Sequence, residues 1–321
     1  MTQLLNAFVH TLKFEAPDIL SLELRPLAGD VFPAFEAGSH IDLHLPHGIV
    51  RSYSLLNDSR ERHRYVVAVL KDKASRGGSR AVHEDLRIAM PLQISEPRNN
   101  FQLVETAEHT VLVAGGIGVT PILSMAQRLH QLGRSFEVIY CARSRRQAAY
   151  VAEIEALSTQ VHWHFDDAQG GPPDLPALLA ARPGAGAANT HYYACGPAVM
   201  LDAFERSCRD LGYTHAHIER FQAVEVAPAS DAQQSYTVEL KRSGQVLNVI
   251  PGQSLLATLQ AAGIYCNTSC EEGICGSCET RVLEGTPDHR DSVLSPEEQA
   301  SQKMMMVCVS GCKSPHLVLD L

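Results

Sequence analysis

Apolar and polar positions alternate with two different periods along the chain. Up to about residue 104, short runs alternate with period two, as at residues 41–45 and 65–70, and Gly and Pro separate them. Period two places successive side chains on opposite faces of a strand. This first segment therefore predicts a small antiparallel β-barrel.

From about residue 105 to residue 225, short apolar strands alternate with longer helical stretches. In the stretch that starts at Pro121, for example, Ile122, Met125, Ala126 and Leu129 share one helical face. Regular alternation of strand and helix predicts a parallel sheet with helices on both faces. The expected strands are 111–114, 136–140, 161–165, 191–194 and 218–221, and the expected helices are 121–132, 148–157, 175–181 and 197–211.

The third segment follows a small, polar, Pro-containing stretch at residues 223–234, which is typical of a linker. Two alternating runs, 235–240 and 245–249, predict a hairpin, and a helix is expected over 254–262. The sequence thus predicts three domains with one linker. Their boundaries are 1–104, 105–225 and 235–321, with 226–234 as the linker.

Charge and composition exclude several classes of protein. The formal net charge is −9 and the pI is near 5.9, which argues against a nucleic-acid partner, since phosphate binding needs a basic surface. The N-terminus lacks the pattern of a signal peptide, and no apolar run is as long as a membrane span. We therefore expect a cytoplasmic protein without a membrane partner. In that compartment, where disulfides are rare, nine cysteines suggest metal or redox chemistry for some of them.

Six of the nine cysteines lie in the last 60 residues, and four of these have a defined spacing. Cys270, Cys275 and Cys278 are separated by four and two residues, and Cys308 follows after 29 more. This is the spacing of a plant-type [2Fe–2S] site. Small residues between the cysteines, Gly273, Gly276 and Ser277, would let backbone N–H groups point at the sulfurs.

Two alternatives accompany this interpretation. Cys312 competes with Cys308 as the fourth ligand, although the run before Cys308 is typical of a buried strand that would carry it. A four-cysteine zinc site usually needs two separate cysteine pairs, which this sequence does not have. Cys266 breaks the spacing and is expected to be a small buried thiol.

Two glycine-containing turns point to a nucleotide. The first, with Gly115, Gly116 and Gly118, follows a strand and is followed by Thr120 and by Pro121 at the helix start. Such a turn lets the backbone approach a pyrophosphate at a helix N-terminus. It departs from the GxGxxG pattern, because Pro121 occupies the third glycine position. The second turn, with Cys195, Gly196 and Pro197, also joins a strand to a helix, and Cys195 would face a nicotinamide.

Arg143 and Ser144 follow the second strand, where they would meet the adenosine ribose. Arg145 and Arg146 could bind a 2′-phosphate or form a solvated helix start, and the second reading favours NADH over NADPH.

Residues of the first segment suggest a flavin. Arg51, Ser52, Tyr53 and Ser54 end a β-run, where a ring with flanking hydroxyls can pack on a flat cofactor. Gly77, Gly78 and Ser79 precede a helical stretch at 80–86, which is typical of a phosphate site. Arg51 could add a bidentate contact to that phosphate.

Together these motifs resemble the FMN-containing reductases of Rieske-type oxygenase systems, of the phthalate dioxygenase reductase and vanillate demethylase reductase type. The resemblance rests on RSYS (51–54), RGGS (76–79), GGIGVTP (115–121), CGP (195–197) and SCEEGICGSC (269–278). It implies a flavin barrel, an NAD domain and a plant-type ferredoxin domain of α+β (β-grasp) fold. It also implies FMN rather than FAD. Further contacts implied by the resemblance are Ala68, Val69, Leu70, Thr120 and Phe221 for FMN and Met200 for NAD.

The function implied by the resemblance is electron transfer from NADH through FMN and a [2Fe–2S] cluster to a terminal Rieske-type oxygenase. No proton-transfer residue is expected; Thr120, Cys195 and Phe221 would neighbour the hydride transfer. Docking to the oxygenase would be transient, and a monomer is expected. From residue 229 onward there are 11 acidic and 6 basic residues, so acidic side chains could meet a basic patch on the partner. The candidates are Glu271, Glu272, Glu297 and Glu298.

Three other functions stay open at this point. The acceptor could be a separate ferredoxin or a non-Rieske monooxygenase, the protein could be a redox sensor without NADH turnover, or the last domain could be a zinc-stabilised binding module. His289 is expected to have a structural role, because a Rieske centre needs two histidines. The methionines at 304–306 are expected to be part of the core.

Overall fold

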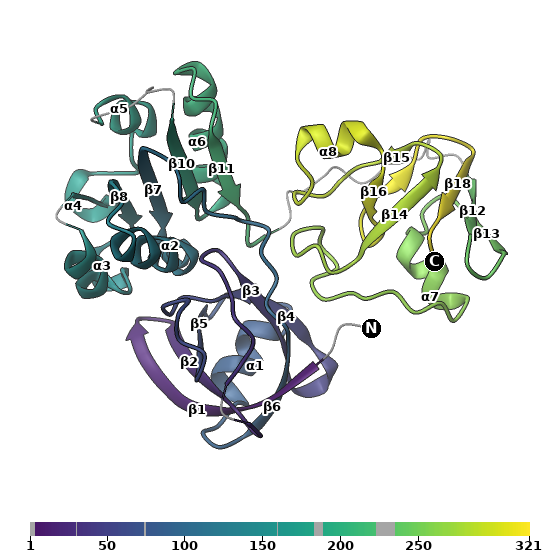
Figure 1. The fold of residues 1–321 in the computed structure, drawn as a ribbon, viewed down its shortest axis with the longest axis horizontal. Helices are drawn as coiled ribbons and strands as arrows, with labels where there is room; N and C mark the ends of the chain where they lie inside the picture. Colours follow the sequence, from purple (N-terminus) through teal and green to yellow (C-terminus); the bar gives the residue numbers. More distant parts are fainter. Residues whose placement is uncertain (1–3, 30, 74, 159, 183–188, 223–234) are drawn as a thin grey trace. The chain divides into compact units, whose positions relative to one another are not determined.

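The computed structural model describes residues 4–29, 31–73, 75–158, 160–182, 189–222 and 235–321. It divides the chain into two compact units, residues 2–221 and residues 222–321 (Figure 1). The linker predicted at 223–234 lies outside the described residues.

The first segment folds into one antiparallel sheet of six strands. The strand order is β4-β3-β6-β1-β2-β5. Leu22, Leu24, Ile41, Leu43 and Tyr65 point inward and are fully buried, as the alternating pattern predicts. This is the predicted antiparallel barrel. Its elements are β1 (Leu4–Ala16), β2 (Ile19–Pro26), β3 (His40–His44), β4 (Val50–Ser54), β5 (Tyr65–Leu70), α1 (Gly78–Glu84) and β6 (Pro91–Ser95).

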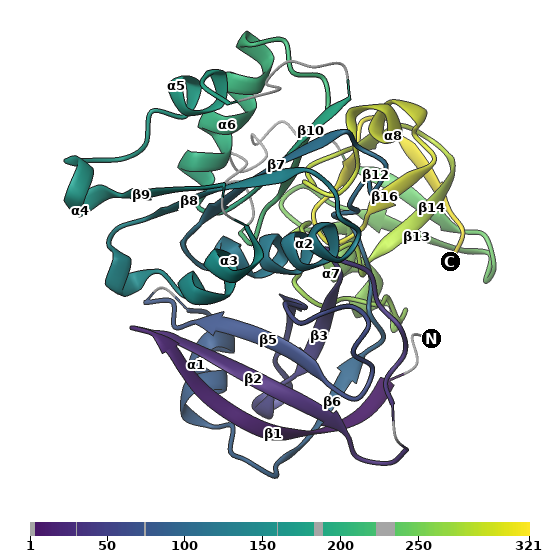
Figure 2. The ribbon, with the colours of Figure 1, turned by 60° about the vertical axis from the view of Figure 1, so that its left-hand side comes forward.

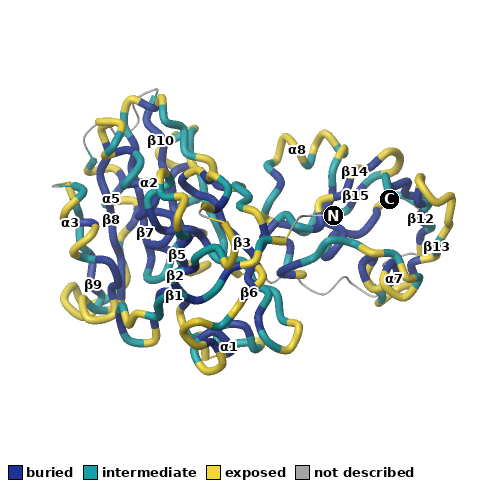
Figure 3. Tube along the Cα trace, turned by 60° about the horizontal axis from the view of Figure 1, so that its bottom comes forward, coloured by how far each residue is buried: buried dark blue, intermediate teal, exposed yellow. Residues whose placement is uncertain are grey.

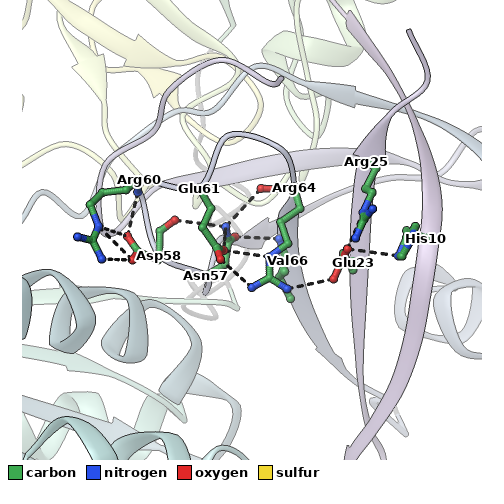
Figure 4. A network of polar contacts seen from close by, with 9 residues as sticks. All are labelled: His10, Glu23, Arg25, Asn57, Asp58, Arg60, Glu61, Arg64 and Val66. Atoms are coloured by element: carbon green, nitrogen blue, oxygen red, sulfur yellow. Dashed lines mark hydrogen bonds and ion pairs between the residues drawn. The ribbon is translucent and has the colours of Figure 1, made fainter. Parts of the chain in front are cut away.

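A loop that follows β4 is fixed by polar contacts (Figure 4). The carbonyl oxygen of the Asn57 side chain accepts a 2.9 Å hydrogen bond from the Val66 backbone. Arg64 donates to Glu61 at 2.9 Å and to Glu23 of β2 at 3.0 Å. These contacts therefore fix the loop that directly follows the RSYS motif at the end of β4.

The second segment forms a five-stranded parallel sheet in the order β11-β10-β7-β8-β9. Figure 2 shows α2 and α3 on one side of this sheet and α5 and α6 on the other. The predicted parallel sheet with helices on both faces is confirmed. Its elements are β7 (His109–Gly115), α2 (Val119–Gln131), β8 (Phe136–Ala142), α3 (Val151–Leu157), β9 (Val161–Phe165), α4 (Asp166–Gln169), α5 (Leu175–Ala180), β10 (Thr190–Cys195), α6 (Ala198–Asp210) and β11 (Ala216–Glu219).

In this segment the predicted start of one helix and the predicted place of one strand were wrong, and one short helix was missed. Helix α3 begins at Val151 and not at 148, because Tyr150 adopts a left-handed φ of 61°. Strand β11 covers Ala216–Glu219 and not 218–221, because its ladder with β10 ends at the Cys195–Glu219 pair. The one-turn helix α4 was not expected.

The barrel and the parallel sheet share one apolar core. Ala68 of β5 and Phe101 pack in the same buried cluster as Leu112 of β7 and Ile122 of α2. Phe101 also meets the ring of Tyr193 edge-on, with centroids 5.5 Å apart. The first two predicted domains therefore form a single packed unit.

The second unit has a mixed sheet with the order β13-β12-β18-β14-β16. Strands β12 and β18 run parallel, and the other pairs are antiparallel. Helix α7 is capped by Ser254, whose hydroxyl accepts from Ala257 N at 3.1 Å, and buries Leu255, Leu256 and Leu259. The predicted α+β ferredoxin fold is confirmed. Its elements are β12 (Tyr236–Leu240), β13 (Gln245–Val249), α7 (Leu255–Ala261), β14 (Glu279–Glu284), β15 (Pro287–Asp288), α8 (Pro296–Ser301), β16 (Met304–Met306), β17 (Gly311–Cys312) and β18 (His316–Leu319).

Burial follows these layers in each unit (Figure 3). Strands β7 and β10 are almost entirely buried, and Met305 and Met306 of β16 belong to the core of the second unit, as expected. Among the described residues, no helix combines the length and apolar character needed to cross a membrane.

Candidate functional site

Residues 270–278, here called the cluster loop, gather buried thiols in two pairs. The sulfurs of Cys278 and Cys308 lie 3.1 Å apart, and the thiols of Cys270 and Cys275 hydrogen-bond to each other. All four cysteines are at least 90% buried. Within the described ranges, no group of three or more His, Cys, Asp or Glu side chains is placed so that it could hold one metal ion. Two separate pairs fit a cluster of two irons, which needs four thiolates, better than one tetrahedral zinc ion.

Backbone N–H groups of the cluster loop point at the sulfurs, as its small residues predict. Glu272 N donates to the Cys270 sulfur at 3.3 Å, and Gly273 N donates to the Cys308 sulfur. The hydrogen bond from Cys270, with others from Ser277, lowers the pKa of Cys275 to about 5. The hydrogen bond with Cys275, together with burial, raises the pKa of Cys270, and the hydrogen bond with Cys278, together with burial, raises the pKa of Cys308. Cys275 is therefore the thiol for which these contacts favour the thiolate, which is the form that binds iron.

Gly273 is the residue that allows this loop to close. Its φ is +71°, and a Cβ there would lie 2.6 Å from Val309 Cγ2 and 3.1 Å from Asp291 Cα. Asp291 belongs to a second loop that Ser292 joins to the cluster loop, because Ser292 N donates to Gly273 O at 2.9 Å. Any side chain at position 273 would separate the two loops.

The other cysteine predictions have separate outcomes. The buried strand expected before Cys308 is β16, which ends at Met306, so Cys308 lies in the turn that directly follows the strand and not on the strand itself. The sulfur of Cys312, on β17, contacts the carbonyl oxygens of Ser314 at 3.2 Å and of Thr286 at 3.4 Å. Those contacts explain Cys312 as a packed thiol. Cys266 is partly buried, with a pKa raised by that burial.

The two glycine turns of the first unit lie against each other. A side chain at Gly118 would collide with the carbonyl group of Cys195, and one at Gly115 would lie 2.6 Å from the sulfur of Met200. The turns follow the neighbouring strands β7 and β10, in which Ala114 pairs with Cys195. Ligands of parallel α/β sheets bind at this edge. Gly116, with φ of 54°, opens the turn before α2.

Other residues expected at the nucleotide have defined surroundings. Thr120 is buried, and its hydroxyl donates to Ile117 O at 3.1 Å. Arg143 is exposed at the end of β8 beside Ser144. Arg145 donates to Glu155 at 3.1 Å and lies 5.8 Å from the centre of the Trp163 ring, whereas Arg146 is exposed.

The residues expected to bind the flavin come together from two segments. Arg51 of β4 lies across Gly78, where an added Cβ would be 2.5 Å from Arg51 Cγ. Gly77 has a φ of +98°, and Ser79 accepts from Asp72 N at 3.1 Å. Ser52 donates to Asp42 at 2.6 Å, which fixes the strand. On β5, Ala68 and Val69 are buried and Leu70 is exposed; burial raises the pKa of Tyr53 on β4.

The structure adds Glu219, which the sequence analysis did not select. Its carboxylate accepts a 3.2 Å hydrogen bond from the Ser54 hydroxyl, and it is the register partner of Cys195. Burial raises the pKa of Glu219 to about 8 and also raises the pKa of the Cys195 thiol. Glu219 thus joins the end of β4 to the strand end that precedes the second glycine turn. A single acidic residue at a strand end belongs to no recognisable motif. The only feature of the sequence that could have pointed to Glu219 is its place two residues before Phe221.

Comparisons with known proteins agree with this arrangement. Residues 238–313 match the 2Fe-2S iron-sulfur cluster binding domain, and residues 112–206 match the oxidoreductase NAD-binding domain. The chain is 47% identical to the phenoxybenzoate dioxygenase subunit beta of Ectopseudomonas oleovorans, covering 98% of this chain and 96% of that protein. It is 44% identical to the vanillate O-demethylase oxidoreductase of Pseudomonas sp. (strain HR199 / DSM 7063), covering 99% and 100%.

Two solved structures are similar over almost the whole chain. Phthalate dioxygenase reductase, described as modular for electron transfer from pyridine nucleotides to [2Fe–2S], has a TM-score of 0.70 and 36% identity, covering 99% of this chain and 98% of that one. An intact type IV self-sufficient cytochrome P450 monooxygenase has a TM-score of 0.91 and 37% identity, covering 99% of this chain and 41% of that longer one.

The fold and the site define an NAD(P)H-dependent flavin and iron–sulfur oxidoreductase. The chain belongs to the family of reductases of oxygenase systems that includes phthalate dioxygenase reductase and the vanillate O-demethylase oxidoreductases. The resemblance inferred from the motifs is confirmed.

The Gly273→Ala variant should bind less cluster, because its Cβ would push Val309 and Asp291 away from the cluster loop. Iron content and visible absorbance per chain measure the effect. Gly252→Ala is the control: Gly252 also has positive φ, at +80°, but open space around it. Equal cluster content in the two variants would contradict the steric role of position 273.

The Glu219→Gln variant should flatten the pH dependence of stability in the first unit. The folded pKa of about 8 lies above the ordinary value of 4.5, so the folded unit holds the proton more tightly. That contribution to stability is complete below about pH 4.5 and disappears as the pH rises through about 8.

Urea unfolding followed by the fluorescence of Trp163, the only tryptophan, measures this unit selectively. The exposed Glu108→Gln is the control. A wild-type free energy of unfolding that does not decline between pH 5 and 8 relative to Glu219→Gln would contradict the assignment.

Proposed function

We propose that this protein passes electrons from NADH through FMN and a [2Fe–2S] cluster to a terminal Rieske-type oxygenase. One observation carries the proposal: the Ser54–Glu219 hydrogen bond of 3.2 Å joins the flavin strand to the nicotinamide edge within one packed unit. The second unit buries four cysteines in two pairs that fit the cluster.

FMN would be held by residues from both segments of the barrel. Arg51 and the positive-φ turn at Gly77 would take the phosphate, because a guanidinium group and the backbone N–H groups of such a turn suit an anion. Ser54 would reach the ring edge, and Phe221, which packs against the shared core, would lie on the nicotinamide side. The full proposed set is Arg51, Ser52, Tyr53, Ser54, Ala68, Val69, Leu70, Gly77, Gly78, Ser79, Thr120 and Phe221.

NADH would lie along the edge where the glycine turns meet. Met200, whose side chain covers Gly115 and Gly196, would limit the space above the turns. Arg145 is already bonded to Glu155, which supports NADH over NADPH. The full proposed set is Gly115, Gly116, Gly118, Thr120, Pro121, Arg143, Ser144, Cys195, Gly196, Pro197 and Met200.

The cluster would be held by Cys270, Cys275, Cys278 and Cys308. When bound, FMN accepts two electrons together and the cluster carries one at a time, so the pair converts NADH oxidation into single-electron delivery. The chain itself positions and insulates these groups. Glu219 orients Ser54, and the neutral Cys195 thiol fills the space beside the nicotinamide.

Domain boundaries, partner and location complete the proposal. We retain domains at 1–104, 105–225 and 235–321, with the linker at 226–234 and a monomeric protein that docks transiently. Among the described residues no cysteine forms a disulfide, which fits a cytoplasmic location. The similarity to part of a P450 monooxygenase favours a second candidate, in which the electron acceptor is a non-Rieske monooxygenase.

The Cys308→Ser variant tests the relay. In anaerobic titration with NADH, the wild type should show flavin bleaching and a rhombic electron paramagnetic resonance signal from the reduced cluster. Cys308→Ser should still bleach but lose or alter that signal, whereas Cys312→Ser should behave as wild type because its sulfur contacts only backbone and Ser314 groups. An altered signal in Cys312→Ser with an unchanged one in Cys308→Ser would reverse the ligand assignment.

Acidic residues of the cluster loop should help the oxygenase to dock. Replacing Glu271 and Glu272 with Gln should slow partner reduction several-fold at low salt. The difference in rate between variant and wild type should shrink as ionic strength rises, because salt screens the attraction between exposed charges. The control is the pair Glu239→Gln and Glu284→Gln on β12 and β14. Partner reduction that does not respond to salt would exclude electrostatic docking.

A further inference from the structure

Arg220 lies between Glu219, which accepts the hydrogen bond from Ser54, and Phe221, which the proposed function places on the nicotinamide side. Its side chain is only 8% exposed, and Nη2 donates to Asp202 Oδ1 at 2.8 Å and to Glu205 Oε2 at 2.6 Å. Both carboxylates belong to α6, which packs beside β11 (Figure 1). One guanidinium group therefore joins the end of β11 to the middle of α6.

The position of Arg220 in the chain gives this contact its importance. The last register pair of β11 is Glu219 with Cys195, so Arg220 and Phe221 lie beyond the ladder. Alternation along the strand turns Glu219 towards Ser54 and Arg220 towards α6. The side chain of Arg220 thus fixes a backbone segment that the sheet no longer holds.

The partner helix is itself part of the proposed nucleotide site. Helix α6 begins at Ala198, directly after the second glycine turn, and its Met200 contacts Gly115 and Gly196. Asp202 and Glu205 follow within the next two turns. The contact therefore connects the helix that carries the nicotinamide turn to the strand end that carries Glu219 and Phe221.

The contact balances two negative charges with one positive charge. Asp202 and Glu205 are three residues apart on one helix face, where like charges destabilise each other. Arg220 compensates both carboxylates, and charge-assisted hydrogen bonds of this length are strong and directional. Loss of Arg220 would leave the strand end untethered and the two carboxylates in repulsion.

We propose that Arg220 is a positioning residue that sets Glu219 and Phe221 against the nicotinamide turn for hydride transfer. This rests on the proposed function, since the transfer itself needs bound FMN and NADH. Arg220 bonds Asp202 and Glu205 of α6 and would act on the transfer through its chain neighbours Glu219 and Phe221.

The test compares Arg220→Gln and Arg220→Lys with wild type in anaerobic stopped-flow reduction of the FMN-loaded, full-length protein by NADH. Arg220→Gln should bleach the flavin roughly tenfold or more slowly at saturating NADH, since small misplacements of reacting groups are costly. The NADH concentration for half-maximal rate should change much less. Arg220→Lys should recover part of the rate, because a lysine ammonium keeps a positive charge and several donors for the two carboxylates, which Arg220 bonds through the single atom Nη2, but lacks the planar guanidinium group.

Arg206→Gln is the matched control, because Arg206 is an exposed arginine of the same helix, α6, and should bleach at the wild-type rate. The double variant Arg220→Gln/Glu205→Gln separates positioning from stability. Removing one carboxylate relieves the repulsion, so the thermal stability should rise relative to Arg220→Gln while bleaching stays slow.

Three outcomes would overturn the inference. The first is a wild-type bleaching rate in Arg220→Gln. The second is a variant in which only the NADH concentration for half-maximal rate changes. The third is a double variant in which the bleaching rate recovers fully together with the thermal stability. Absence of bleaching in both wild type and Arg206→Gln would instead overturn the proposed function, together with the inference that rests on it.

Discussion

The shared apolar core between the barrel and the parallel sheet is the constraint on which the site of the first unit depends. Ala68 and Phe101 pack in one cluster with Leu112 and Ile122. A continuous core of this kind holds two sheets at a fixed distance, because close-packed side chains leave no room for sliding. Only for that reason can Ser54 of one sheet meet Glu219 of the other at 3.2 Å.

Within that frame, the backbone needs close approaches that side chains would prevent. The first glycine turn touches the second at Gly118 and Cys195, and Arg51 lies directly on Gly78. Each approach lies where the proposed function places an anionic group beside backbone N–H groups. The glycines therefore act through the absence of a Cβ, and the neighbouring residues Met200 and Arg51 occupy the space that this absence creates.

The second unit holds four thiols in a fixed geometry with little regular structure around them. The cluster loop has no regular secondary structure, so its shape depends on Gly273 and on the bond from Ser292 N to Gly273 O. Backbone N–H groups stabilise negative charge on the sulfurs without any basic side chain. The loop can therefore carry the acidic residues Glu271 and Glu272, which suits electrostatic recognition of a partner.

The sequence by itself determined the three kinds of segment, the alternation of strands and helices in the second segment, the two glycine turns and the cysteine spacing. These features are local, because periodicity, glycine and ligand spacing act within a few residues of the chain. Only the tertiary structure decided which distant residues meet. The Cys278–Cys308 pair, the role of Glu219 and the bonds of Arg220 depend on side chains 15 to 165 residues apart. Packing brings such residues together, and a single sequence carries no local signal for it.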